Sequence, residues 1–240
     1  MITNHSLSVV IPVYNEEGII EKMLRDYHNE IIKKFERAET IIVNDCSKDK
    51  TLEILKKIEK ELNLTIVNLP VNSGHGRALR AGLDLAVNDL VFHTDSDYQH
   101  DPKDFWKLYG KLEGNDLVLG YRHSRMDSTF RKTLTKIVRF ANILLFGVYL
   151  KDANIPFKIY KKDVLKKIMA SVDPKVLAPS ILINIIAARS GYKIGEVPVS
   201  HFDRQTGKVS IVRWKLLKFC YAAFFELLSL RKIPCQKSSS

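Results

Sequence analysis

The chain has 240 residues, of which 45% are hydrophobic and 27% charged, so a disordered or fibrous chain is excluded and one large domain can bury a core. Its three cysteines are an odd number without metal-ligand spacing, which favours a reducing, cytoplasmic setting. The formal charge is +11, but residues 1–121 carry 15 Lys and Arg against 20 Asp and Glu (−5), and residues 122–240 carry 23 against 7 (+16). The basic half indicates an anionic partner (nucleic acid, a phospholipid surface or a phosphorylated substrate) or else a solvated basic face.

The first half of the chain alternates apolar runs typical of buried strands with helical patterns. Strands are predicted over residues 7–12, 40–44, 64–69, 90–94 and 117–120, and helices over 16–35, 50–62, 74–87 and from about Pro102. Strands that alternate with helices of this length predict βαβ units, and therefore an α/β fold with a mostly parallel central sheet flanked by helices. In such sheets ligands bind at the carboxyl ends of the strands.

The alternation breaks down after residue 121. We expect a strand over 155–160, helices over 161–169 and 180–190, an edge strand over 193–202 that carries Pro198, and a basic amphipathic helix over 211–230 before a short tail. No linker divides the chain, so residues 1–210 are expected to form one domain and residues 211–240 a C-terminal helix and tail.

Membrane contact is expected at a surface rather than through a spanning helix. The N-terminus has no signal-peptide pattern, and no stretch reaches the ~20 apolar residues that cross a bilayer. Residues 140–150 and 211–230 combine apolar and aromatic side chains with Lys and Arg, which is typical of interfacial segments. The alternative is that both segments only cover the core.

Two carboxylates, Asp95 and Asp97, directly follow the predicted strand 90–94. Carboxylates two residues apart at a strand end can converge on one hard cation, and Mg²⁺ and Mn²⁺ prefer such oxygen ligands. Gln99 offers a further neutral oxygen. The alternative for this motif alone is a solvated loop that caps the next helix.

Three further polar or glycine-containing segments follow the other predicted strands. They are Pro12–Glu16, Asn44–Thr51 and Asn72–Ala78. Each alone is compatible with a turn or a helix cap. Because parallel strands bring all of these segments to the same sheet edge as Asp95, one nucleotide pocket explains them better than four separate turns.

Together these four motifs resemble glycosyltransferase family 2, and within it the dolichol- or polyprenol-phosphate sugar synthases. The resemblance continues through Gly120–Arg122, Gly191–Val199 and Arg204–Lys208, and so covers about residues 7–210. It implies a single-domain GT-A fold and inverting transfer, with a nucleotide-sugar-binding half over 1–121 and an acceptor half over 122–210.

The resemblance also assigns roles to residues. It implies nucleotide-sugar binding by Pro12, Tyr14, Glu16, Asp45, Gly74 and Asp95, and binding of Mg²⁺ or Mn²⁺ by Asp95, Asp97 and Gln99. It implies acceptor-phosphate binding by Arg122, Arg131, Arg204 and Lys208, with Asp97, Arg122 and Arg204 as the catalytic set.

Two segments depart from the family pattern. Asn44 replaces the first acidic residue of the usual Asp-Asp-x-Ser motif, which is tolerable if Asp45 makes the base contact. Asp152–Lys158 stands where the synthases have a Ser-Gly-Phe-Arg run, so acceptor or donor choice can differ from that of a mannose synthase.

The acceptor is predicted from a missing base. Many family members with hydroxyl acceptors use a carboxylate in the helix that corresponds to residues 176–189, and this stretch contains no Asp or Glu. A hydroxyl nucleophile benefits from a base by about 10²–10⁴-fold. A phosphate monoester is already largely ionised at neutral pH, because its second pKa is about 6. The sequence therefore favours a polyprenyl or dolichyl phosphate acceptor.

The predicted function is transfer of a hexose or related sugar from a GDP- or UDP-linked donor to a polyprenyl phosphate, by an enzyme peripherally bound at the cytoplasmic membrane face. A separate membrane subunit or a homo-oligomer is the alternative to direct membrane contact. The alternative acceptor is a carbohydrate or lipid hydroxyl, and the alternative class is a non-catalytic sugar-nucleotide or nucleic-acid binding module. Nucleic acid is not expected as a partner, because no recognition motif accompanies the basic residues.

Overall fold

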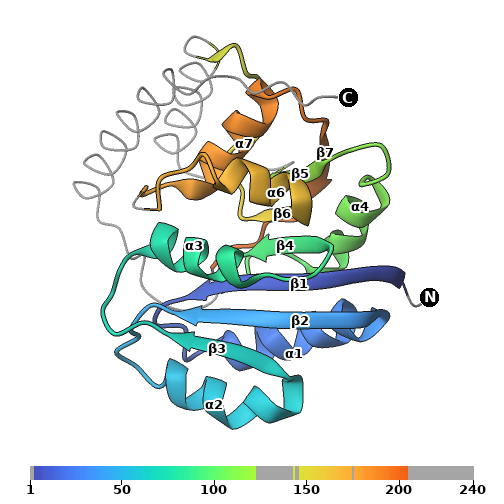
Figure 1. Ribbon diagram of the computed structural model, residues 1–240. Helices are drawn as coiled ribbons and strands as arrows, with labels where there is room; N and C mark the ends of the chain where they lie inside the picture. The colour runs from blue at the N-terminus through green and yellow to red at the C-terminus, as the bar shows by residue number, and fades with distance from the viewer. Residues whose placement is uncertain (1–2, 123–142, 144–145, 175, 205–240) are drawn as a thin grey trace.

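The computed structural model describes residues 3–122, 143, 146–174 and 176–204. A seven-stranded sheet with strand order β3-β2-β1-β4-β6-β5-β7 forms its centre, and helices cover both faces (Figure 1). The strands are β1 (Thr3–Val13), β2 (Phe35–Asn44), β3 (Leu64–Asn68), β4 (Leu90–Thr94), β5 (Leu117–Arg122), β6 (Phe157–Lys161) and β7 (Ile194–Val199). The helices are α1 (Ile20–Glu30), α2 (Thr51–Leu62), α3 (His75–Leu85), α4 (Phe105–Gly110), α6 (Lys162–Met169) and α7 (Pro179–Arg189). Short 3₁₀ turns lie at Ile32–Lys34 and Pro102–Asp104.

The sheet is mostly parallel, as predicted. β1 pairs in parallel with β2 and β4, β2 with β3, and β5 with β7, whereas β6 runs antiparallel to both β4 and β5. The prediction of an edge strand at β7 is also confirmed. Because β1 to β4 share one direction, their carboxyl ends meet at one edge of the sheet, on the left in Figure 1.

Consecutive residues of β1 pack on opposite faces of the sheet. Val10 joins a core cluster that includes residues of α3, α6 and α7, whereas Val9 and Ile11 join a second cluster that includes residues of α1, α2 and α4. All three side chains are buried. This explains the unbroken apolar run in the sequence, since a strand covered on both faces needs no alternation with polar residues.

Two glycines let α3 lie close to its neighbours. A Cβ at Gly82 would lie 2.5 Å from Cγ1 of Val10, so α3 can pack directly on β1 only without a side chain there. A Cβ at Gly76 would lie 2.1 Å from the carbonyl oxygen of Leu177, in the segment before α7. The start of α3 therefore lies against the segment that leads into α7, and its later part lies against the sheet.

Several element boundaries differ from the prediction. The helix expected over 16–35 forms only as α1, and β2 already begins at Phe35, whose ring stacks on Trp106 at a centroid distance of 5.9 Å. Asn15 has a φ of +55°, and the Glu16 carbonyl accepts from the N–H groups of Ile19 and Ile20 in a turn, so the regular helix starts only at Ile20. β1 begins at Thr3 rather than residue 7, with an irregularity in its pairing to β2 between Thr3 and Ser6.

Several predicted features lie outside the described residues. They are Arg131, Lys208, the helix over 211–230 and the first part of 140–150. At the end of that last segment, Val148 and Leu150 are buried in the core and Tyr149 is exposed. Within the described ranges, none of the helices combines the length and apolar character needed to cross a bilayer.

Candidate active site

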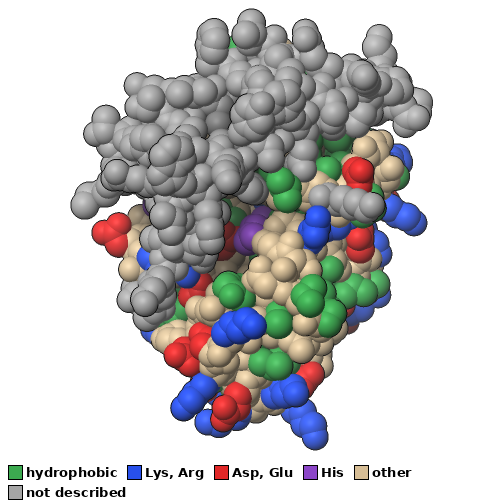
Figure 2. Space-filling model, turned by 90° about the vertical axis from the view of Figure 1, so that its left-hand side faces the viewer, with side chains coloured by type: hydrophobic (Ala, Val, Ile, Leu, Met, Phe, Trp, Pro, Cys, Tyr) green, Lys and Arg blue, Asp and Glu red, His purple; other side chains and the backbone are tan. Residues whose placement is uncertain are grey.

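The chain turns sharply at the carboxyl ends of β1, β2 and β4. Asn15, Cys46 and Tyr98 have φ values of +55°, +58° and +54°, and Gly74 before α3 has a φ of +88°. A positive φ is uncommon for residues other than glycine, and such positions cluster at functional sites. Figure 2 looks onto this edge of the sheet, where acidic side chains and a histidine reach the surface.

The loops after β1 and β2 interlock through hydrogen bonds. The Asn15 N–H donates to Ser47 Oγ (3.0 Å), and Asn15 Oδ1 accepts from the Lys48 N–H (2.7 Å). Asn44 donates from Nδ2 to Asn68 Oδ1 (2.6 Å) and accepts from Ser47 Oγ (2.5 Å). Asn44 therefore uses an amide donor that the family's usual carboxylate does not have, which gives this departure a structural reason.

Asp45 organises the next loop. Its buried carboxylate accepts from the backbone N–H groups of Ser73 (2.6 Å) and Gly74 (2.8 Å). These contacts fix the start of α3 against the end of β2. The predicted contact between Asp45 and a nucleoside stays a prediction.

Asp95 and Asp97, the predicted cation ligands, have opposite electrostatic surroundings. Burial raises the pKa of Asp95, but the charge and hydrogen bond of His75, together with the nearby His93 imidazole, more than offset this effect and hold the pKa below its usual range. Burial and the charge of Asp95 raise the pKa of Asp97 to about 6. A positive charge bound nearby would therefore stabilise the ionised form of Asp97.

Gln99 connects this loop to the chain after β7. The Gln99 side chain donates from Nε2 to the Phe202 carbonyl (3.0 Å), and the Gln99 backbone carbonyl accepts from the Phe202 N–H (2.8 Å). The predicted role of Gln99 as a metal ligand stays a prediction.

Both described arginines of the predicted acceptor set are held by buried carboxylates. Arg122 donates to both oxygens of Asp152 (2.7 and 3.2 Å), and Arg204 forms an ion pair with Glu16. Burial raises the pKa of Glu16 to about 7 even though Arg204 lowers it. Because Glu16 and Arg204 are 188 positions apart, this pair brings the end of the acceptor half onto the nucleotide half.

Three polar side chains at the site were missed by the sequence interpretation. His75 Nε2 and His93 Nε2 lie 2.8 and 3.7 Å from Asp95 Oδ1. Lys158 of β6 is fully buried and donates to Ser180 Oγ of α7 (2.7 Å), and burial lowers its pKa to about 7. His93 and Lys158 could have been found in the sequence, because each is a polar residue inside a mostly apolar strand.

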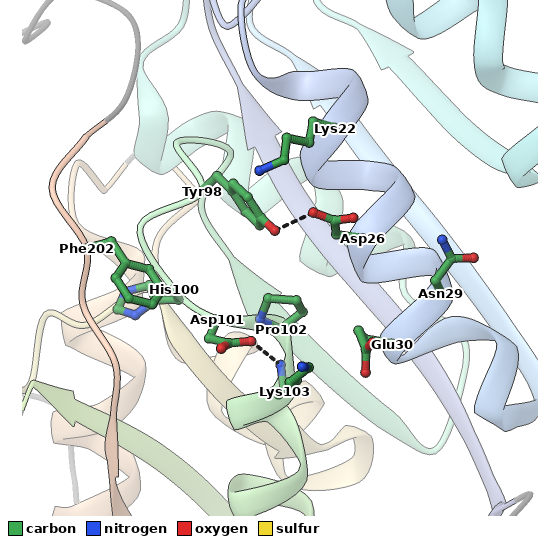
Figure 3. A pocket seen from close by; sticks show the side chains of 10 residues that line it. All are labelled: Lys22, Asp26, Asn29, Glu30, Tyr98, His100, Asp101, Pro102, Lys103 and Phe202. Carbon is green, nitrogen blue, oxygen red and sulfur yellow. Dashed lines mark hydrogen bonds between the residues drawn. The ribbon is translucent and has the colours of Figure 1, made fainter.

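A pocket of about 510 Å³ lies between α1 and the loop after β4 (Figure 3). In it Tyr98 donates to the Asp26 carboxylate, and Lys22 Nζ lies 4.9 Å from the centroid of the Tyr98 ring. Neither Asp95 nor Asp97 lines this pocket. The contact anchors the Tyr98 side chain to α1. Because Tyr98 stands between Asp97 and Gln99 in the sequence, it also anchors the loop that carries these two residues.

The strand-end loops, the paired carboxylates and the sheet order agree with one family. The sequence profile of Glycosyl transferase family 2 matches residues 8–169. The chain belongs to this family. The resemblance inferred from the motifs is thereby confirmed.

Family members among curated proteins and solved structures are similar over most of the chain. The undecaprenyl-phosphate 4-deoxy-4-formamido-L-arabinose transferases of Salmonella choleraesuis (strain SC-B67) and Salmonella typhimurium (strain LT2) are 28% identical over 218 residues, which are 90% of this chain and 65% of theirs. The chain thus spans about two thirds of the length of these curated relatives.

Two solved structures share the fold. Glucosyl-3-phosphoglycerate synthase from Mycobacterium tuberculosis, in complex with UDP, has a TM-score of 0.68 and 22% identity over 96% of this chain and 82% of its own. S. aureus TarS 1-349 has a TM-score of 0.58 and 22% identity over 80% of this chain and 58% of its own. These similarities confirm the predicted GT-A fold.

Proposed function

We propose that this family 2 glycosyltransferase moves a sugar, with inversion, from a nucleoside diphosphate sugar to a polyprenyl phosphate. The curated relatives that match 90% of the chain carry undecaprenyl phosphate in their names. The transferred sugar and the donor base are left open, with GDP and UDP as the candidate nucleotides.

The observation that carries the proposal is the chemistry of α7. This helix packs on α3 and is buried from Pro179 to Ala187, and residues 176–189 contain no carboxylate. Of its polar side chains, Ser180 accepts from Lys158 and Asn184 donates through Nδ2 to the Ala153 carbonyl, and neither a hydroxyl nor an amide serves as a base at neutral pH. A phosphate needs no base to attack the donor, whereas a hydroxyl does.

The donor would bind at the carboxyl ends of β1 to β4. Pro12, Tyr14, Glu16, Asp45 and Gly74 would surround the nucleoside, with Asp95 near the diphosphate. Asp95, Asp97 and Gln99 would hold Mg²⁺ or Mn²⁺. The residues fit a cation, because the mutual repulsion that raises the pKa of Asp97 is relieved by one. The cation would neutralise the nucleoside diphosphate as it leaves.

Arg122 and Arg204 would position the acceptor phosphate. Asp152 and Glu16 hold their guanidinium groups in place before any substrate binds. Guanidinium groups bind phosphate through paired hydrogen bonds, so prior ordering of these side chains favours binding. Arg131 and Lys208 are proposed to complete the set.

A polyprenyl phosphate lies in a bilayer, so the enzyme must reach a membrane surface. We propose that residues 211–230 and the part of 140–150 that precedes Val148 lie at that surface, with the catalytic domain over 1–210 on its cytoplasmic side; Val148 and Leu150 themselves belong to the core. A membrane subunit or an oligomer would serve the same purpose. Flotation with anionic liposomes at low salt tests direct contact, and protein that stays at the bottom of the gradient contradicts it.

The test of the proposed function is a transfer assay with the purified chain, Mn²⁺, labelled UDP- or GDP-linked sugars and a short polyprenyl phosphate. We expect a lipid-linked product with one of the two nucleotide classes, and inverted anomeric configuration by NMR. A labelled lipid with retained configuration would disprove the mechanism, and absence of any lipid product across the donor panel would disprove the acceptor class.

A further inference from the structure

Three ligand-type side chains converge at the end of β4. His75 comes from the first position of α3, His93 from β4 itself, and Asp95 directly follows β4. One ligand atom of each lies within 4.8 Å of the other two. Among the residues that the structure describes, no other His, Cys, Asp or Glu side chains form such a group.

His93 carries the strongest signal. Its side chain is 1% exposed, and neither ring nitrogen has a hydrogen-bond partner within the described part of the chain. Its Nε2 lies 3.7 Å from Asp95 Oδ1, longer than a good hydrogen bond. Buried polar groups are nearly always paired, so an unpaired imidazole aimed at a carboxylate indicates a ligand between or beside them.

His75 is held in place by its own loop. Gly74 takes a φ of +88°, Asp45 accepts from the Gly74 N–H, and Gly76 fits closely against Leu177. These contacts fix the start of α3 so that His75 Nε2 lies 2.8 Å from Asp95 Oδ1. A half-exposed side chain on a fixed backbone can bind a cation with little reorganisation.

We propose that His75 and His93 are, with Asp95, direct ligands of the divalent cation, and that their nitrogens make the site prefer Co²⁺ or Zn²⁺ over Mg²⁺. This inference deepens the proposed function, since the cation is the one that assists transfer. Mg²⁺ demands oxygen ligands, whereas imidazole suits the later divalent metals. Asp97 lies outside the close group and would add a carboxylate oxygen.

The competing explanation is that His75 only neutralises Asp95 and that the cation contacts oxygens alone. The two explanations differ in one observable, which is whether a nitrogen nucleus is bonded to the metal. Electron spin-echo spectroscopy of bound Mn²⁺ detects ¹⁴N coupling directly, and Co²⁺ absorption provides a second probe. Neither readout needs sugar transfer.

The experiment uses the full chain and three variants, with Mn²⁺, Co²⁺ and Mg²⁺ at up to millimolar concentration, each with and without UDP or GDP. His75→Ala and His93→Leu each remove one nitrogen, and His5→Ala is the matched control, an exposed residue of β1 that contacts Tyr109. We expect ¹⁴N coupling in wild type and in His5→Ala, and reduced coupling in the other two. Co²⁺ binding should weaken by about tenfold or more, since even residues that only orient ligands contribute about 10–100-fold.

The inference is overturned if wild type binds Mn²⁺ without ¹⁴N coupling, or binds neither Mn²⁺ nor Co²⁺. His75→Ala replaces a half-exposed side chain, so it remains informative if His93→Leu does not fold. The transfer assay fails or succeeds separately. Nitrogen coordination without transfer would support this inference and reject the proposed function. Mg²⁺-supported transfer without nitrogen coordination would support the proposed function and reject this inference.

Discussion

The proposed donor side and the proposed acceptor side of this site are held together by different interactions. On the donor side, loops after neighbouring strands bind each other through backbone N–H groups, as Ser47 binds Asn15 and Asp45 binds Gly74. On the acceptor side, the described arginines depend on side-chain ion pairs, Arg122–Asp152 and Arg204–Glu16. The donor side is therefore organised by backbone hydrogen bonds between neighbouring loops, whereas the acceptor side depends on ion pairs, of which Arg204–Glu16 joins residues near the two ends of the described chain.

The largest expected effect is at the donor side, in Asp97→Ala. Removing a group that stabilises developing charge typically costs about 10²–10³-fold in turnover, and we expect at least that loss. Relief of repulsion with Asp95 should leave the melting temperature unchanged or higher. Steady-state kinetics and thermal unfolding measure the two effects, with the exposed Asp84→Ala as control. Near-wild-type turnover would remove Asp97 from the site.

On the acceptor side, Arg122→Ala should cost stability as well as activity. Asp152 is 6% exposed, and its carboxylate would lose its Arg122 partner in a buried place. Breaking a buried pair costs about 3–5 kcal/mol, so a loss of about 2–4 kcal/mol is expected for this partly shielded pair. Urea unfolding of the single and double variants with Asp152→Ala gives the coupling energy. Additive losses would contradict the pairing.

The burial of Glu16, which outweighs the opposing charge of Arg204, should show in the pH dependence of stability. The pKa of Glu16 is raised from 4.5 to about 7, so the folded state binds the extra proton and its stabilising effect is lost as the pH rises from about 4.5 through 7. Glu16→Gln should flatten this fall by on the order of 2–3 kcal/mol. Asp97 shifts in the same direction, so the comparison is made between the variant and wild type. Identical slopes in urea unfolding from pH 4 to pH 8 would contradict the assignment.

The smallest expected effect is at Tyr98, which joins the donor loop to α1. Tyr98→Phe removes the hydrogen bond to Asp26 and should cost about 1 kcal/mol of stability. Because Tyr98 lies between Asp97 and Gln99, we expect a few-fold weaker binding of Mn²⁺ with nucleotide, measured by calorimetry. Asp26→Ala, which removes the acceptor, should behave alike. A variant with unchanged stability and metal binding would show that this anchor has no influence on the loop.

The sequence predicts the proposed donor side better than the proposed acceptor side, because the first is marked by local patterns and the second by contacts between distant segments. Strand periodicity and polar residues at strand ends are local patterns, so β1 to β4 and the motif around Asp95 could be placed without the structure. The late start and early end of α1 could not, because the first follows the turn at Glu16, whose N–H donates to the Thr51 hydroxyl, and the second follows the packing of Phe35.

Contacts between distant segments were beyond local patterns. His93 faces Lys158 only because β6 pairs with β4 in an antiparallel register. Arg204 reaches Glu16 across 188 positions. The motifs identified Arg204 and Glu16 as site residues, but that the two form a pair follows only from the tertiary fold.

The most direct test of the central claim is a choice of acceptor. Wild type is given its donor sugar with equal amounts of a polyprenyl phosphate and the free polyprenol of the same chain length, and the two labelled products are separated by chromatography. Because α7 supplies no base, we predict transfer to the phosphate and none to the alcohol. Transfer to the alcohol at a comparable rate would contradict the account.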